Sequence, residues 1–446
     1  MVPHDLITQP SVLAFADDPL LLALLRTSLV TTPKLEAVLT SIRQALLVSE
    51  CRQPRWLPFV TALAIQCFAN EYAWMEQPNE TEAVEALKAD RTSPMAAALL
   101  ACYRPLHTQL SPQEFEDTPW PDSLSAVLDQ QWYAPQEERL LASSIPSLTA
   151  IDHETSVEVR AQYESHPYPR WTDIPPMAHH YTLTQWIQHR FPQATLPTTN
   201  PAPLTILIAG CGTGQQSAIA GLRFADAHIT ALDLSRSSLA YAMRKTTAMN
   251  LRHITYAQAD LLELDAAIGV FDVVECIGVL HHLRDPMQGW KKLVERTAPG
   301  GYLCIALYSE LARRKLDAVR AFAGEQKHDS DASLRAFRSA ILALPPEHPA
   351  AFLREQHDFY ALSMLRDLVF HVQEHRFTIP RIQTALGELG LEFGGFDLTA
   401  AQRHQFATMH KEKTNLLDLD QWAAFETAYP DSFASMYHFL LRKPLA

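Results

Sequence analysis

The sequence lacks close cysteine pairs and long hydrophobic runs. Its six cysteines stand far apart, and no two have the spacing of a metal-binding pair. The apolar run at residues 20–25 is far too short to cross a bilayer, and the first residues form no basic leader. We therefore expect reduced, buried cysteines in a cytoplasmic protein that contacts no membrane.

Basic residues are also scarce. The chain has 37 Lys and Arg against 50 Asp and Glu, a net charge of −13, which disfavours nucleic acid as the main partner. Its 446 residues exceed one comfortable core, and 47% of them are apolar, which predicts two or three structural units.

Glycine is sparse as well, with 14 residues, yet three stand together after a short aliphatic run at residues 206–209. Such a run is typical of a parallel strand buried on both faces. Gly210, Gly212 and Gly214 then allow a tight turn and a close approach to a ligand. A dinucleotide fingerprint would place the third glycine one position later, where Gln215 stands, so that reading is weakened.

Three later segments follow in a fixed order. Residues 228–234 read as a strand that ends at Asp233, and residues 254–261 as a strand that ends at Asp260. Residues 271–282 form a further hydrophobic run that ends in His281 and His282. A carboxylate at the end of a strand can accept hydrogen bonds from the hydroxyls of a ribose.

This order of glycines, acidic strand ends and histidine pair resembles the class I S-adenosylmethionine-dependent methyltransferases. The resemblance implies an α/β fold, a Rossmann-like doubly wound sheet of seven strands with an antiparallel last strand. We place strands six and seven at residues 391–398 and 436–443. The chain departs from many relatives at Ala209, where they carry an acidic residue.

The resemblance implies S-adenosyl-L-methionine as the cofactor, with Asp233 at the ribose and Asp260 at the adenine amino group. The full set of expected cofactor-binding residues is Gly210, Cys211, Gly212, Gly214, Asp233, Leu234, Asp260, Leu261, Glu275 and Tyr163.

His281 and His282 are the candidate catalytic residues, because an imidazole just past the fourth strand could take a proton from the acceptor. Methyl transfer itself mainly requires alignment and exclusion of water. The Asn/Asp-Pro-Pro-Tyr motif of exocyclic amino methyltransferases is absent, since Glu275 to Gly278 occupies its place.

The domain organisation is predicted as a helical domain at 1–155, a linker at 156–200 and a methyltransferase domain at 201–446 with a lid-like insertion at 309–377. In the linker, the aromatic and proline residues of 163–171 either cover the cofactor or join the two domains. In the insertion, Asp367, His371 and Glu374 would share one face of a helix. We interpret that face as a polar stripe and expect no metal.

We expect a methyltransferase that acts on an oxygen or nitrogen of a small molecule. A protein side chain, docked on the helical domain, is the main enzymatic alternative. A regulatory module that binds the cofactor without turnover stays open, as does a homodimer formed through the helical domain.

Overall fold

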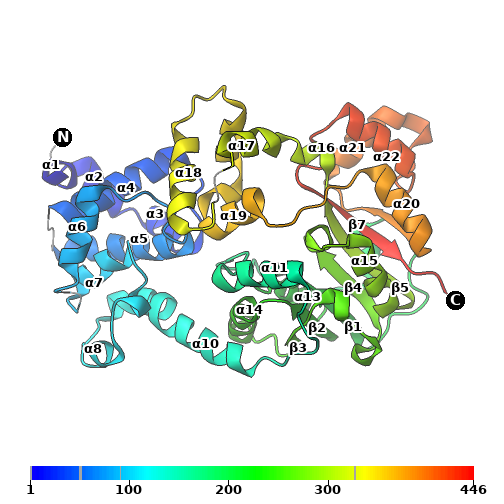
Figure 1. Ribbon diagram of the computed structural model, residues 1–446, viewed down its shortest axis with the longest axis horizontal. Coiled ribbons are helices and arrows are strands. Elements are labelled where there is room, and N and C mark those ends of the chain that lie inside the picture. The colour runs from blue at the N-terminus through cyan, green and yellow to red at the C-terminus, as the bar shows by residue number, and fades with distance from the viewer. Residues whose placement is uncertain (1–2, 50–52, 91, 326–327, 446) are drawn as a thin grey trace. The chain divides into compact units, whose positions relative to one another are not determined.

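The computed structural model describes residues 3–49, 53–90, 92–325 and 328–445. The chain forms two compact units (Figure 1). The helical unit comprises residues 1–140 and 318–370, and the sheet unit comprises residues 141–317 and 371–446.

The sheet unit contains a seven-stranded sheet of order β3-β2-β1-β4-β5-β7-β6. Strands β1 to β5 run parallel, whereas β7 runs antiparallel to both β5 and β6. The predicted fold class, with its antiparallel last strand, is confirmed. The strands are β1 Leu204–Ala209, β2 Ala227–Asp233, β3 Ile254–Gln258, β4 Phe271–Ile277, β5 Thr297–Tyr308, β6 Glu392–Phe396 and β7 Met436–Arg442.

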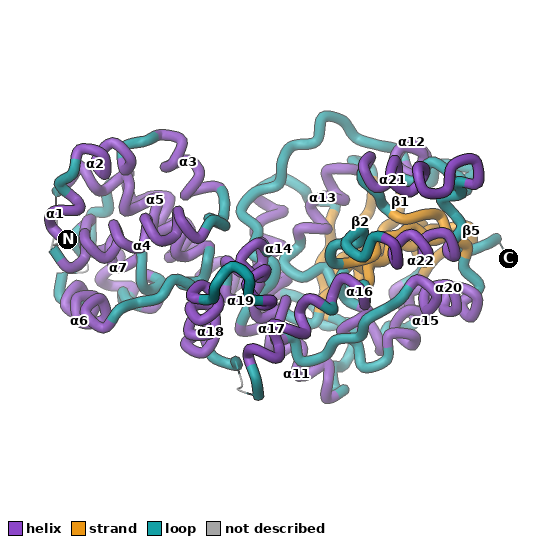
Figure 2. The backbone as a smooth tube through the Cα atoms, turned by 90° about the horizontal axis from the view of Figure 1, so that it is seen from above, coloured by secondary structure: helices purple, strands orange, loops and turns teal. Residues whose placement is uncertain are grey.

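Helices cover both faces of this sheet (Figure 2). Alternate residues of β1 explain why, because Ile206 and Ile208 enter one hydrophobic core while Leu207 and Ala209 enter the other. The helices of the sheet unit are α11 Glu154–Ser165, α12 Leu183–Arg190, α13 Gln215–Arg223, α14 Arg236–Ala248, α15 Pro286–Arg296, α16 Glu310–Arg313, α20 Ile379–Leu389, α21 Ala400–His410 and α22 Leu419–Ala428. Helices α10 Ala134–Ser144 and α17 Lys315–Ala323 each cross a boundary between the units.

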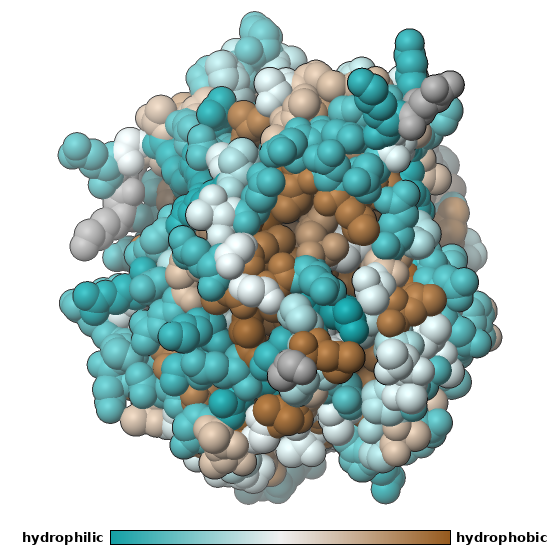
Figure 3. Space-filling model, turned by 90° about the vertical axis from the view of Figure 1, so that its right-hand side faces the viewer, coloured by the Kyte–Doolittle hydropathy of each residue, from teal (hydrophilic) through white to brown (hydrophobic). Residues whose placement is uncertain are grey.

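The face at the right-hand side of Figure 1, where α20 and α22 lie, carries apolar side chains near its middle, and hydrophilic residues surround them (Figure 3). Met409 of α21 and Tyr429 after α22 are among the partly exposed apolar residues of the sheet unit. Within the part of the chain that the structure describes, no helix has the length and apolar character to cross a membrane.

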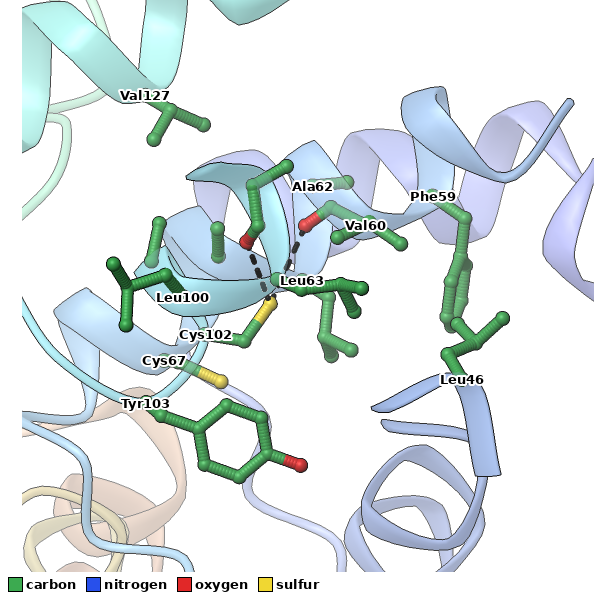
Figure 4. Close-up of a cluster of buried hydrophobic side chains, with 14 of the residues drawn as sticks. Leu46, Phe59, Val60, Ala62, Leu63, Cys67, Leu100, Cys102, Tyr103 and Val127 are labelled. Carbon is green, nitrogen blue, oxygen red and sulfur yellow. Dashed lines mark hydrogen bonds between the residues drawn. The ribbon is translucent and has the colours of Figure 1, made fainter. Parts of the chain in front are cut away.

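Proline begins most helices of the helical unit, where its missing N–H leaves no hydrogen bond unmade. The helices are α1 Pro3–Ile7, α2 Pro10–Ala16, α3 Pro19–Thr27, α4 Pro33–Val48, α5 Leu57–Ala69, α6 Pro78–Leu87, α7 Pro94–Ala101, α8 Pro112–Glu116, α9 Ser125–Leu128, α18 Asp331–Ala343 and α19 Leu362–Phe370. Their core is apolar, and the thiol of Cys102 donates there to the carbonyls of Val60 and Ala98 (Figure 4).

Five cysteines are buried and free, as expected: Cys67, Cys102, Cys211, Cys276 and Cys304. Cys51 lies outside the described residues.

The compact units differ from the predicted domain boundaries. Most of the insertion belongs to the helical unit, where Arg338 of α18 forms a buried ion pair with Glu36 of α4, with an Nη1–Oε1 distance of 2.6 Å. Arg335 donates to the carbonyl of Tyr72 at 2.7 Å. In the other direction, residues 141–155 belong to the sheet unit, since residues 146–148 pair with Gln258 at the edge of β3.

The helix expected across residues 367–374 ends at Phe370. Asp367 is the only one of the three polar residues that lies on α19, so the predicted common face of Asp367, His371 and Glu374 does not form. The next helix begins as predicted, because the side chain of Thr378 caps α20 by accepting from the backbone N–H of Arg381.

Candidate functional site

The glycine loop lies between β1 and α13, and all three of its glycines have positive φ angles. A Cβ at Gly212 would stand 2.6 Å from the carbonyl oxygen of Tyr168, and one at Gly210 would stand 2.3 Å from the side chain of Val279. Both contacts are too close for any other residue. The backbone N–H groups of Gly210 and Cys211 donate to the carbonyl of Leu232, which ties the loop to β2.

The aromatic segment at 163–171 packs on this loop. The backbone N–H of Thr213 donates to Tyr168 O at 3.3 Å, its hydroxyl donates to the carbonyl of Pro169, and the indole of Trp171 donates to Thr213 O at 2.9 Å. The segment therefore belongs to the sheet unit and covers the glycine loop. That the segment covers a bound cofactor stays a prediction, as does its role in joining the two domains.

Asp233 stands at the end of β2 beside the loop. Its Oδ2 accepts from Gly212 N at 2.8 Å and its Oδ1 from Ser235 N at 2.9 Å. Burial raises the pKa of Asp233 to about 6, although the two backbone donors oppose this rise, and the nearby Glu164 adds to it. Leu234, the next residue, accepts from the side chain of Gln258 through its carbonyl.

Asp260 follows β3 and is fully buried. Its Oδ1 accepts from Leu262 N at 2.9 Å, and its backbone N–H donates to the hydroxyl of Thr149. Its Oδ2 has no hydrogen-bond partner among the described residues, while Leu261 beside it is buried. A buried carboxylate oxygen without a donor is costly, so this atom suits a ligand that brings an N–H group.

The adenine amino group of S-adenosylmethionine is such a donor, and the carboxylate of Asp233 can accept further hydrogen bonds from ribose hydroxyls. The strand ends β2 and β3 are neighbours in the sheet, so the two carboxylates stand at the same edge. The residues at this edge therefore fit the nucleoside part of the cofactor.

Two predicted cofactor residues have other partners. Glu275 in β4 is buried, with its Oε1 3.3 Å from Arg223, and Gln216 donates to its Oε2. This carboxylate joins β4 to α13. The hydroxyl of Tyr163 lies 3.2 Å from Nε2 of His371, and its ring stacks on that of Tyr168 with centroids 6.5 Å apart. Tyr163 therefore contacts both the histidines and the segment that packs on the glycine loop.

His281 and His282 form a short 3-10 turn after β4 and are both buried. The ring of His281 stacks on Tyr308 with centroids 3.7 Å apart, and the ring of His282 stacks on His371 at 3.5 Å. Burial lowers the pKa of both histidines well below the usual value, and neighbouring positive groups act in the same direction. Both imidazoles are therefore neutral at pH 7.

The segment after α19 passes over these histidines. The backbone N–H of His375 donates to His281 O at 2.7 Å, and Nδ1 of His282 lies 2.6 Å from Gln373 O. Glu374 pairs with the buried Arg313. Sequence reasoning missed Gln373, since it acts through its main-chain carbonyl and no side-chain pattern reveals that.

Residues 207–305 match the family model described as a methyltransferase domain. The match includes the glycine loop, both acidic strand ends and the two histidines. The sheet unit is thus a class I methyltransferase domain, and S-adenosylmethionine is the cofactor of that class.

Among individual proteins, the chain is 30% identical over 263 residues to an uncharacterized protein of Synechococcus sp., which covers 55% of this chain and 61% of that protein. It is 31% identical over 160 residues to a trans-aconitate 2-methyltransferase of Deinococcus radiodurans, covering 36% of this chain and 58% of the relative. The chain therefore spans about six tenths of the length of these curated relatives.

A solved structure, PKMT2 from Rickettsia typhi in complex with AdoHcy, is 17% identical with a TM-score of 0.41. The alignment covers 60% of this chain and 54% of that one. This likeness is too partial to support an argument about function.

Proposed function

We propose that the protein transfers a methyl group from S-adenosylmethionine to an oxygen or nitrogen of a small-molecule acceptor. The observation that carries this proposal is the buried Oδ2 of Asp260, which has no partner among the described residues and stands one strand away from Asp233 and the glycine loop. Two relatives act, by their names, on small molecules: the trans-aconitate 2-methyltransferase and a ubiquinone biosynthesis O-methyltransferase of Marinobacter nauticus that is 27% identical over 116 residues.

The bound cofactor supplies a methyl group activated by a positively charged sulfur. Asp233 and Asp260 hold the nucleoside by accepting from the ribose hydroxyls and from the adenine amino group. The residues of 168–171 close over the glycine loop, which limits the access of water on that side. Most of the acceleration then comes from alignment of the acceptor with the methyl group.

The first experiment is titration calorimetry of the purified protein with S-adenosylmethionine and S-adenosylhomocysteine, with NAD as the control. Roughly micromolar binding of the first two ligands, and none of NAD, is expected. A folded protein that binds neither sulfur nucleoside would refute the proposal.

The acceptor is then sought with a labelled methyl donor. Small-molecule and protein fractions of a cell extract are incubated separately with the protein, and label in the small-molecule fraction is expected. Label confined to the protein fraction would favour the protein side-chain alternative, with the helical unit as docking platform. Binding without label in either fraction would favour a regulatory module.

A further inference from the structure

We propose that His282 is the catalytic residue that takes a proton from the methyl acceptor, and that residues 371–375 are positioning residues that orient it. The inference rests on the proposed function and adds one property of the acceptor. The acceptor carries an O–H or N–H group at the atom that is methylated.

The partner of His282 sets its tautomer. Its Nδ1 lies 2.6 Å from the carbonyl oxygen of Gln373, and a carbonyl oxygen can only accept. Nδ1 therefore carries the proton. A neutral imidazole has one N–H, so Nε2 of His282 holds the lone pair and can receive a proton.

His281 has the opposite tautomer. Its Nδ1 lies 3.2 Å from the backbone nitrogen of Tyr308, which can only donate. The proton therefore sits on Nε2, a buried atom without a hydrogen-bond partner among the described residues. A nitrogen that already carries a hydrogen cannot act as a base, so His281 offers a donor.

The segment 371–375 holds both rings in place. His371 stacks on His282 with an interplanar angle of 24°, and its own Nδ1 accepts from Gln373 N at 3.1 Å. Its Nε2 consequently donates to the hydroxyl of Tyr163 at 3.2 Å. The backbone N–H of His375 donates to His281 O. Main-chain groups thus fix the orientation of the base from one side, and the stacked ring fixes it from another.

The reaction balances with a single neutral base. Nε2 of His282 takes the proton while the acceptor atom bonds to the methyl carbon and the carbon–sulfur bond of the donor breaks. One positive charge disappears from sulfur and one appears on the imidazole. An acceptor that is a carboxylate at neutral pH has no proton to give and would not need this residue.

The assignment can be tested without an acceptor. In protein labelled with ¹⁵N-histidine, long-range ¹H–¹⁵N correlation spectra distinguish the two tautomers, and the spectra of His281→Asn and His282→Asn assign the signals. The expected result is a proton on Nδ1 of His282 and on Nε2 of His281. A proton on Nε2 of His282 would overturn the proposal, whether or not the cofactor binds.

The catalytic role is tested with labelled methyl donor and a probe set of catechol, 4-hydroxybenzoate and a primary aromatic amine. Asparagine at position 282 can still donate to Gln373 O but has no lone pair at the Nε2 position, so kcat should fall about 100-fold while KM and cofactor affinity stay within about threefold. Asparagine at position 281 can still accept from Tyr308 N and should lose far less.

His228, exposed on β2, provides the unaffected control as His228→Asn. Equal kcat for His282→Asn and the wild type on any probe would overturn the base assignment while leaving the methyltransferase proposal intact. If no probe is methylated, the tautomers seen in the ¹H–¹⁵N spectra test the assignment of His282 as the base. Calorimetry tests cofactor binding separately.

Discussion

At the scale of single residues, the acidic side chains of the candidate site differ in which of their oxygens already have hydrogen-bond partners. One carboxylate oxygen of Asp260 has no hydrogen-bond partner among the described residues, whereas both oxygens of Asp233 accept from backbone N–H groups. Both oxygens of Glu275 contact side chains of α13. The three carboxylates therefore differ in the hydrogen bonds that they already make within the fold.

Asp260→Asn should weaken S-adenosylmethionine binding about 10- to 100-fold, since the amide can still accept from Leu262 N but would place N–H against the adenine amino group. Calorimetry measures the loss, and circular dichroism checks the fold. Asp265→Asn is the matched control, because Asp265 is an exposed aspartate that caps a short turn. Equal affinity for Asp260→Asn and the wild type would remove Asp260 from the cofactor site.

Cofactor affinity should rise with pH through about 6. The pKa of Asp233 is raised to about 6 by burial, and only the ionised carboxylate accepts fully from ribose hydroxyls. Below that pH the affinity should fall by up to about tenfold per pH unit, because binding must then release a proton.

Calorimetry between pH 5 and 8 tests this dependence. Asp233→Asn should bind more weakly and lose the dependence around pH 6, since the substitution removes this titration alone. A wild-type profile that is flat across the range would contradict the ribose assignment.

At the scale of elements, a buried ion pair is one of the contacts that join α18 to the N-terminal helices of the helical unit. Arg338 and Glu36 have side-chain exposures of 1% and 7%, so Arg338→Met leaves a buried, uncompensated carboxylate. This should cost about 3–5 kcal/mol of unfolding free energy, whereas replacing both residues by leucine should recover most of the loss.

Urea unfolding followed by circular dichroism measures these changes. The exposed pair of Arg314 and Glu310 supplies the control, because Arg314→Met should cost less than about 1 kcal/mol. Equal losses for Arg338→Met and Arg314→Met would mean that the buried pair does not hold α18.

The sequence predicts an element best where a run of suitable residues is bounded by a residue that is typical of the start or end of that element. The strands β1 to β4 were predictable because aliphatic runs end in glycine or aspartate, and α20 because Thr378 and Pro380 mark its start. The helix expected across His371 fails because the backbone of 373–377 bonds instead to the turn after β4 and to β5. Those contacts join residues about 60 to 100 positions apart, which local periodicity cannot reveal.

At the scale of the whole molecule, the two units are interleaved along the chain. Removing residues 1–140 alone should give a poorly folded protein, because residues 318–370 would lose Glu36 and the rest of their unit. Removing 1–140 and replacing 318–370 by a short linker should leave a folded sheet unit that still binds the cofactor. The linker can be short because Asp317 and Arg376 form an ion pair at 2.7 Å.

Thermal unfolding and calorimetry compare the two truncated proteins. If the first truncation is as stable as the second, residues 318–370 do not depend on the N-terminal helices. Full cofactor affinity in the second would show that the nucleoside site is complete within the sheet unit.

The interleaved chain also constrains the order of events during synthesis. A ribosome delivers residues from the N-terminus, and domains generally fold as their sequence emerges. The helical unit cannot be completed before α18 and α19 are made. The sheet cannot be completed before β7 is made, because β7 lies between β5 and β6 although it follows both in the sequence. Nascent chains should thus carry exposed apolar surface on both units until β7 has been made, and surface of this kind is what ribosome-bound chaperones cover.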